Sequence, residues 1–256
     1  MVTSTPVHPE GPRYGASIAY LSGLWTGPQV WRAAAQYLAH RGWAGLLIDA
    51  GSVAGGIAAR ATAVTEFLRK LPAMPVLVGH DAGALVALAA ASRTEVPAVV
   101  LVSPLRPGAP GTHALAWSRG LPWALVSRRP VAPPRGETGR AFLADRPSDV
   151  GASPEDPRLL SELARRTPIA RPASMPPALV LHGASDPFLS SDEARRLATD
   201  LGAELIDLDG VGHWLPAAAA WQRAGDRVHR WLVQRLGDTN LELYAEAMAD
   251  RDDDEV

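Results

Sequence analysis

The sequence contains no cysteine, and this absence removes several kinds of chemistry at once. Thiol nucleophiles, disulfide bonds and thiolate metal sites are excluded, and the redox compartment is left open. A membrane-spanning segment is also missing, because no run of apolar residues approaches the length that a bilayer requires. The first residues, MVTSTPVHPEGPRYG, lack the basic start and apolar run of a secretion signal. We therefore expect a cytoplasmic protein.

Signals for a metal or a nucleotide cofactor are equally scarce. No helical or hairpin pairing of the kind that binds zinc links His8, His40, His80, His113, His182 and His229. The glycines of GSVAGG at residues 51–56 lack the spacing of a dinucleotide-binding fingerprint. We predict neither a metal nor an organic cofactor.

An excess of charge of one sign is missing too. The chain has 25 basic and 27 acidic residues, which gives a formal net charge of −2. Nothing in this balance suggests binding to nucleic acid or to an anionic membrane. The expected partner is a small molecule, and the oligomeric state is left open.

What the sequence does contain is an alternation of short apolar runs and helix-length amphipathic stretches. Strands are predicted at residues 16–21, 44–49, 75–79, 98–103, 178–182 and 204–208. Helices are predicted at residues 29–40, 57–71, 84–91, 191–201 and 217–236. Such alternation is typical of crossover units on a parallel sheet. We predict an α/β fold with a mainly parallel sheet of about six strands, flanked by helices.

One interval, residues 105–175, breaks this rhythm. It has scattered prolines and no clear strand, which predicts an inserted, partly helical lid on a core formed by residues 1–104 and 176–256. The interval holds 11 arginines and 6 acids, whereas the rest of the chain holds 14 basic and 21 acidic residues. This surface could attract an anionic substrate. The simpler interpretation, which we favour, is an ordinary solvated surface in an arginine-rich protein.

The segment MPVLVGHDAGALVALAAA combines an apolar strand, a tight turn with small residues on both sides, and an alanine-rich helix. This pattern is typical of a nucleophile elbow, in which small residues let strand and helix approach closely. Asp81 occupies the centre of the turn, at the sheet edge where open α/β sheets bind ligands. Asp81 could also do no more than cap the helix.

Two later segments each place a polar residue after a predicted strand. Asp186 follows PALVLHG, and His213 follows LIDLDG. Nucleophile, acid and histidine thus come in the order of hydrolase-fold triads. Because the carboxyl ends of parallel strands share one edge, we expect the three side chains to converge there. Taken singly, Asp186 could be a turn residue and His213 a loop histidine.

On these motifs the chain resembles the α/β-hydrolase superfamily over roughly residues 16–236. Its pattern is most similar to the aspartate-nucleophile branch, which contains epoxide hydrolases and haloalkane dehalogenases. The segment YLSGLWTGPQVW is similar to the oxyanion loop of that superfamily, with Gly23 at its glycine and Ser22 where histidine is common. The resemblance implies that the backbone amides of Leu24 and Ala82 form the oxyanion hole. Fewer than 20 residues precede the first predicted strand, so the usual leading hairpin is expected to be shortened or missing.

An aspartate nucleophile implies a particular kind of substrate. A carboxylate that attacks an ester forms a mixed anhydride, which is no more stable than the ester, so ester hydrolysis is disfavoured. A carboxylate that attacks a saturated carbon forms an ordinary ester, which water activated by His213 and Asp186 can hydrolyse. We predict a hydrolase that acts through an alkyl-enzyme ester, with an epoxide favoured over an alkyl halide.

The usual supports for the leaving group are absent. Epoxide hydrolases of this fold resemble one another in using lid tyrosines, yet none of the four tyrosines lies within residues 105–175. Dehalogenases typically hold the halide with a tryptophan after the nucleophile and an Asn or Trp in the oxyanion loop, where this chain has Ala82 and Leu24. Substrate-binding donors could come from four indoles, which could equally be packing aromatics: Trp25, Trp117, Trp123 and Trp214. We expect at least one of Trp117 and Trp123 on the inner wall of the lid.

These absences keep other hypotheses open. Asp81 and His213 could act as general base and acid in an isomerisation, elimination or cyclisation that has no covalent intermediate. The chain could also be esterase-like, or a catalytically inactive binding protein on a hydrolase scaffold. A trapped alkyl ester on Asp81 would separate the first hypothesis from the others.

Overall fold

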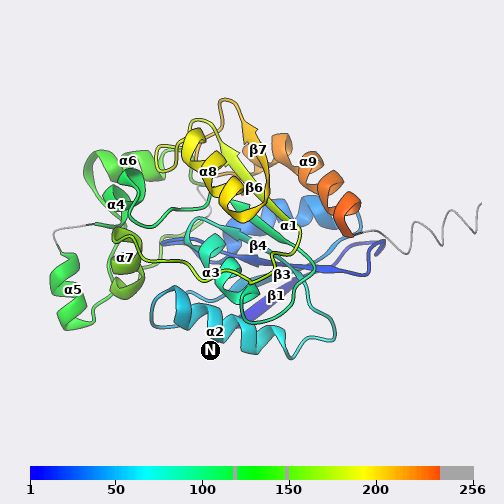
Figure 1. The fold of residues 1–256 in the computed structure, drawn as a ribbon, viewed down its shortest axis with the longest axis horizontal. Coiled ribbons are helices and arrows are strands. Elements are labelled where there is room, and N and C mark those ends of the chain that lie inside the picture. Colours follow the sequence, from blue (N-terminus) through cyan, green and yellow to red (C-terminus); the bar gives the residue numbers. More distant parts are fainter. Residues whose placement is uncertain (118–119, 148–149, 237–256) are drawn as a thin grey trace, which may run out of the picture.

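The computed structural model describes residues 1–117, 120–147 and 150–236, and it shows a twisted sheet with helices on both faces (Figure 1). Within these ranges one sheet has seven strands, in the order β1-β3-β2-β4-β5-β6-β7. Strand β1 pairs with β3 in the antiparallel sense, and every other pairing is parallel. The strands are β1 (Thr3–Val7), β2 (Ser17–Leu21), β3 (Ala44–Asp49), β4 (Val76–His80), β5 (Val99–Val102), β6 (Ala178–Gly183) and β7 (Glu204–Leu208).

The predicted α/β fold is confirmed, and each of the six predicted strands lies within one residue of its expected bounds. The physical reason is clearest at the centre of the sheet. Strands β4, β5 and β6 are buried along their whole length, because helices cover both faces. Continuous apolar runs are the sequence signature of such strands.

Strand β1 was not predicted, and it raises the strand count from about six to seven. It lies at the edge of the sheet, its residues are mostly exposed, and it contains Pro6. A proline is tolerated in an edge strand, but it lowers the strand signal of the sequence. Since β1 pairs with β3 and not with β2, a single antiparallel strand stands where a leading hairpin was expected to be shortened or missing.

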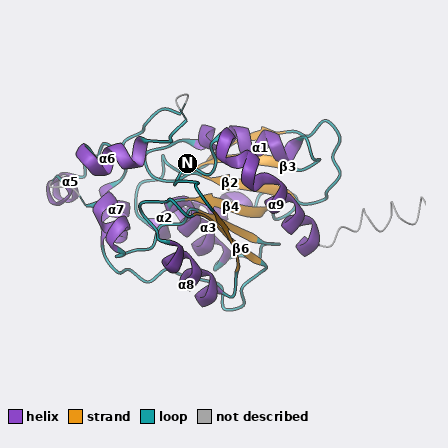
Figure 2. Cartoon of the chain, turned by 90° about the horizontal axis from the view of Figure 1, so that it is seen from above, coloured by secondary structure: helices purple, strands orange, loops and turns teal. Residues whose placement is uncertain are grey.

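Five helices sandwich the sheet. Helices α1 (Arg32–Ala39) and α9 (Ala218–Leu236) lie on one face, and α2 (Ile57–Leu68), α3 (Ala82–Ala91) and α8 (Ser191–Leu201) cover the other (Figure 2). A 3-10 turn, η1 (Pro28–Trp31), leads into α1. All ten residues of α3 are buried, since alanine and glycine let it pack closely against β4 and α2. This packing fixes the start of α3 at the carboxyl edge of the sheet.

Residues 105–175, called the insertion below, join β5 to β6. Their helices are α4 (Pro110–Ala116), α5 (Leu121–Ser127), α6 (Gly136–Leu143) and α7 (Pro157–Ala164), and Val131 forms an isolated bridge with Glu155. Figure 1 shows the four helices grouped beyond one end of the sheet. The insertion is thus partly helical, as predicted. The last part of the predicted core, residues 237–256, lies outside the described residues. In the described part of the chain, no helix is long and apolar enough to cross a membrane.

Candidate active site

Asp81 lies at the turn between β4 and α3, with a φ of 57° and a ψ of −124°. Such a backbone conformation is rare for a residue with a side chain, and it persists where the surrounding structure enforces it. Small neighbours make the turn possible. A Cβ on Gly79 would lie 2.6 Å from the Cα of Ala84, and a Cβ on Gly83 would lie 2.8 Å from the carbonyl carbon of Leu21. The GHDAG segment therefore folds into a sharp turn with Asp81 at its apex.

Asp186 and His213 reach the same edge from the loops that follow β6 and β7. The Phe188 amide donates to Asp186 Oδ1 at 2.8 Å, which fixes the carboxylate. His213 Nδ1 lies 2.8 Å from Asp186 Oδ2, and its Nε2 lies 3.4 Å from Asp81 Oδ2. The structure therefore brings the three predicted catalytic residues together. Their role in catalysis stays a prediction.

The three side chains are buried together, and burial shapes their ionisation. Asp81, His213 and Asp186 are 0%, 2% and 7% exposed. Burial by itself raises the pKa of Asp186, but the His213 ring and its hydrogen bond outweigh this and hold the pKa below its usual value. Burial by itself lowers the pKa of His213, but Asp186 and then Asp81 reverse this effect and raise the pKa to about 10. At neutral pH the resting site therefore holds a His213 imidazolium paired with the Asp186 carboxylate.

His80 is a further buried residue of the site, and the sequence analysis considered it only as a metal ligand. Its Nε2–H donates to the backbone carbonyl of His213 at 3.0 Å, and the two rings lie 4.9 Å apart. Burial lowers the pKa of His80 to about 4, and the neighbouring His213 adds to this effect. His80 is therefore neutral. Its position directly before Asp81 in the GHDAG turn was the signal that could have identified it.

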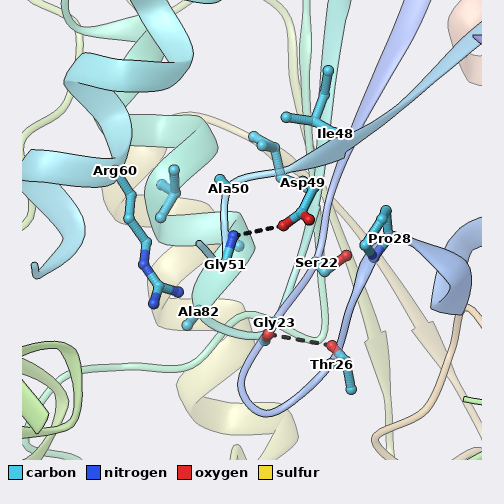
Figure 3. Close-up of a pocket in the computed structure, with 13 residues that line it drawn as sticks. Ser22, Gly23, Thr26, Pro28, Ile48, Asp49, Ala50, Gly51, Arg60 and Ala82 are labelled. Carbon is cyan, nitrogen blue, oxygen red and sulfur yellow. Dashed lines mark hydrogen bonds between the residues drawn. The ribbon is translucent and has the colours of Figure 1, made fainter. Parts of the chain in front are cut away.

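The segment predicted as the oxyanion loop packs directly against the nucleophile position. A Cβ on Gly23 would lie 2.7 Å from the Asp81 carboxyl carbon and 2.9 Å from the His80 carbonyl oxygen. The Thr26 hydroxyl donates to the Gly23 carbonyl at 3.2 Å and closes the loop (Figure 3). On the other side, the Ala82 amide donates to Asp81 Oδ1. Of the two predicted oxyanion residues, Ala82 thus contacts the Asp81 carboxyl group, and Leu24 is fully buried directly after Gly23.

A small cavity lies beside this loop and is distinct from the triad. Ser22, Gly23, Arg60 and Ala82 line it, and Figure 3 shows Arg60 reaching from α2 toward Ala82. Its volume of about 10 Å³ suffices for about one water molecule and not for a substrate. Within the described ranges, no group of three or more His, Asp or Glu side chains could hold a metal ion.

A comparison of the sequence with known families gives a match over residues 18–238, to the alpha/beta hydrolase family. The chain belongs to that family. The match spans the predicted nucleophile, acid and histidine positions of this α/β hydrolase. No curated protein matches the sequence.

Solved structures agree on the fold of this α/β hydrolase and differ in their activities. A thermophilic esterase from Thermogutta terrifontis shares 18% identity, with a TM-score of 0.66 over 91% of this chain and 93% of that one. A monoacylglycerol lipase from Paleococcus ferrophilus shares 17% identity, with a TM-score of 0.64 over 92% and 99%. An ancestral haloalkane dehalogenase shares 18% identity, with a TM-score of 0.60 over 91% and 95%. At these identities the likeness shows the fold alone.

The four tryptophans predicted as substrate-binding donors lie in two different environments in this α/β hydrolase. Trp117 and Trp123 are 50% and 68% exposed, so the expectation that one of them lines the inner wall of the lid is wrong. Trp117 stacks on His113, 5.8 Å away. Trp25 and Trp214 are buried, but their indole N–H groups donate to the carbonyls of Val131 and Phe142. These donors are therefore engaged in holding the insertion.

The residue that covers the site is instead Phe142 of α6, which the sequence analysis missed. Phe142 is fully buried, and its ring lies 5.8 Å from that of His213 and 5.0 Å from that of Trp214. Phe188, from the loop that carries Asp186, packs on His213 from a ring distance of 5.2 Å. The His213 ring is therefore covered by Phe142 and Phe188, and the Asp81 side chain beside it is not exposed to solvent.

Proposed function

We propose that this α/β hydrolase uses Asp81 as a nucleophile against a saturated carbon electrophile and releases product through an alkyl-enzyme ester. The observation that carries the proposal is that the two carboxylate oxygens of Asp81 have different partners. Oδ1 accepts the Ala82 amide, whereas Oδ2 faces the His213 ring at 3.4 Å. One oxygen is thus held where an oxyanion would develop, and the other is available for attack beside the base.

Two balanced steps follow from this arrangement. In the first, Asp81 Oδ2 forms a bond to the substrate carbon while the bond from that carbon to its leaving group breaks. A halide leaves as the anion, and an opened epoxide oxygen takes up a proton from solvent. The His213 imidazolium loses its proton to solvent before the second step. In the second, water gives a proton to His213 Nε2 and attacks the carboxyl carbon of the ester. Negative charge then develops on Oδ1, against the amides of Ala82 and Leu24. Collapse of this intermediate breaks the ester bond, and the departing alkoxide takes the proton of the new carboxyl group and leaves as the alcohol. Asp81 returns as a carboxylate beside protonated His213.

The electrostatics of the site support this order of events. In the resting site two carboxylates raise the pKa of His213 to about 10, which disfavours the ring as a base. Alkylation converts Asp81 into a neutral ester and removes one of these two partners. The pKa of His213 then falls, because less negative charge stabilises the imidazolium. Alkylation therefore makes His213 a stronger candidate for the base at the stage when there is an ester to hydrolyse.

We favour an epoxide as the electrophile, with an alkyl halide second. The substrate is a small molecule, and if it is anionic the arginines of the insertion could attract it. We propose that the insertion acts as the lid over this site. We keep the expectation of a cytoplasmic enzyme without a cofactor. An ester substrate is disfavoured for the chemical reason given above, although esterases and lipases share the fold.

A second candidate is an acid and base role for Asp81 and His213 in a non-hydrolytic reaction. The observation that favours it is the shortage of leaving-group donors among the described residues. The Trp25 and Trp214 indoles are engaged, and no tyrosine lies in the insertion. Proton transfer within a bound substrate would need no such donor.

The deciding experiment traps the ester. His213→Gln should still alkylate but not hydrolyse, so incubation with a reactive epoxide or an alkyl halide should leave a stable mass increase on the peptide that contains Asp81. Asp81→Asn is the matched control and should show no adduct. If neither electrophile modifies the His213 variant, the covalent route is wrong and the non-hydrolytic candidate takes its place.

A further inference from the structure

Trp25 joins the oxyanion loop to the insertion by two hydrogen bonds. Its indole N–H donates to the Val131 carbonyl at 2.9 Å, across 106 positions of the chain. Its own carbonyl accepts from the Ser153 amide at 3.0 Å. The ring also packs edge-on against Phe142, with 5.4 Å between the ring centroids. Three separate segments of the insertion therefore contact this residue.

The backbone of Trp25 is held in an unfavourable conformation. Its φ is 52°, in the left-handed region that bulky side chains rarely adopt. A residue keeps such a conformation when its surroundings over-determine it. Here the surroundings are the contacts with the insertion, and Trp25 is only 2% exposed. Loss of those contacts would let residue 25 return to an ordinary φ.

The same backbone leads directly to the catalytic centre. Leu24, the predicted oxyanion donor, precedes Trp25, and Gly23 packs against the Asp81 carboxyl carbon. A rotation about the backbone of residue 25 changes how the chain enters and leaves the loop, which the Thr26 bond to Gly23 keeps short. Because the hydrogen bond between Thr26 and Gly23 closes this short turn, a change of φ at residue 25 has to be taken up by the backbone of residues 23–26, which includes the Leu24 amide.

The segments that hold Trp25 are themselves anchored to the core. Val131 and Glu155 exchange two backbone hydrogen bonds of 2.8 Å each. The Glu155 carboxylate forms an ion pair with Arg60 of α2, and both side chains are buried. The backbone bridge between Val131 and Glu155, which accepts the Trp25 indole N–H, is thus attached to α2 through Arg60.

We propose that Trp25 is a positioning residue that couples closure of the insertion to the oxyanion loop. With the insertion closed, the bonds to Val131 and Ser153 hold residue 25 in its left-handed conformation and aim the Leu24 amide at the Asp81 carboxyl group. With the insertion open, residue 25 relaxes and the amide turns away. The kinetic part of this inference rests on the proposed function, because the oxyanion loop serves hydrolysis of the ester and not its formation.

The kinetic test uses Trp25→Phe, which keeps an aromatic ring and removes the indole donor. In single-turnover experiments with an alkyl halide, alkylation of Asp81 should proceed at the wild-type rate. Hydrolysis of the ester should slow about five- to tenfold, the effect of one neutral hydrogen bond. Val126→Ala, at an exposed position of the insertion, is the control and should change neither step. Equal slowing of both steps in Trp25→Phe would overturn the proposal, since it would indicate packing alone.

A second test needs no substrate, so it separates this proposal from the proposed function. Glu155→Gln weakens the buried pair with Arg60 and should speed amide hydrogen exchange at Ser153 and at residues 24–26 together, several-fold in each case. Glu137→Gln, on α6, should leave both unchanged. Faster exchange at Ser153 with unchanged exchange at residues 24–26 would show that the loop does not follow the insertion. Unchanged exchange at both would show that the Arg60 pair does not anchor the bridge, and either result overturns the proposal.

Discussion

The neutral ring of His80 donates its Nε2–H to the backbone carbonyl of His213, over 3.0 Å and inside the closed site. This bond links the residue before Asp81 to the loop that carries His213. Asp81 and His213, the proposed nucleophile and base, follow different strands, β4 and β7, which are not neighbours in the sheet. His80 therefore supplies a direct restraint on the distance between Asp81 and His213.

Replacing His80 tests this restraint. His80→Phe leaves the His213 carbonyl buried without its donor, which should lower the free energy of unfolding by about 1–3 kcal/mol. Hydrolysis of the ester should slow as well, because the His213 loop is no longer fixed. His80→Gln offers an amide donor and should recover part of both losses. Urea unfolding and single-turnover rates measure the two effects, and a glutamine variant no better than the phenylalanine variant would contradict the hydrogen-bond interpretation.

The pH dependence of stability should carry the signature of His213. Its pKa rises from 6.5 in the unfolded chain to about 10 in the folded one. The protonated His213 ring stabilises the fold fully below the pKa of the unfolded chain. This stabilisation is lost as the pH rises from that value through the pKa of the folded protein, at up to about 1.4 kcal/mol per pH unit. The contribution of Asp186 depends on pH in the opposite direction. Because the pKa of Asp186 is lowered in the folded protein, its carboxylate stabilises the fold above the pKa of the unfolded chain, and this stabilisation is lost at more acid pH.

The measurement is the free energy of unfolding between pH 6 and pH 10, roughly the window that these two values of the His213 pKa set. His213→Gln should remove the alkaline decline. His40→Gln, at an exposed histidine on the end of α1, should retain it. An equal decline in wild type and in His213→Gln would mean that another group is responsible.

The core of the fold and the triad could be predicted from the sequence because both depend on local patterns. Buried parallel strands appear as apolar runs, and a polar residue within a few positions after such a run lies at the carboxyl edge, as Asp81 and Asp186 do. The roles of the aromatic residues could not be predicted in this way. The partner of Trp25 is Val131, far along the chain, and no periodicity in either segment encodes that contact.

The insertion shows the same limit. Its partly helical character follows from its composition, but the orientation of each short helix depends on packing against the core. Trp117 and Trp123 face outward, whereas Phe142 points inward onto His213. A short amphipathic segment with one phenylalanine carries no signal that separates these outcomes. The ion pair between Glu155 of the insertion and Arg60 of α2 joins residues far apart in the chain, and no sequence pattern predicts it.

We predict that the Phe142 side chain blocks access of a substrate to Asp81. Its ring packs against those of Trp25, His213, Trp214 and Phe188. If the insertion unfolds together with the core, Phe142→Ala should lower the free energy of unfolding by about 3–5 kcal/mol. At the same time Asp81 becomes accessible, so a small alkyl halide should alkylate it faster than in wild type. Leu143→Ala, at the partly exposed next position, is the control for both measurements. Slower alkylation in Phe142→Ala would indicate that Phe142 helps to bind the substrate and does not block it.

The identity of the nucleophile is tested by the path of the oxygen atom. If Asp81 forms an ester, water attacks its carboxyl carbon, and one of the two carboxylate oxygens leaves in the product. Wild-type enzyme in heavy-oxygen water, limited to a single turnover, should therefore release unlabelled product and carry the label on the peptide that contains Asp81. A second turnover should pass that label to the product. Asp81→Asn should incorporate no label under the same conditions. Product labelled in the first turnover, with no label in the protein, would mean that Asp81 acts as a base on water, with the Oδ2 that faces His213 accepting a proton and forming no bond to carbon.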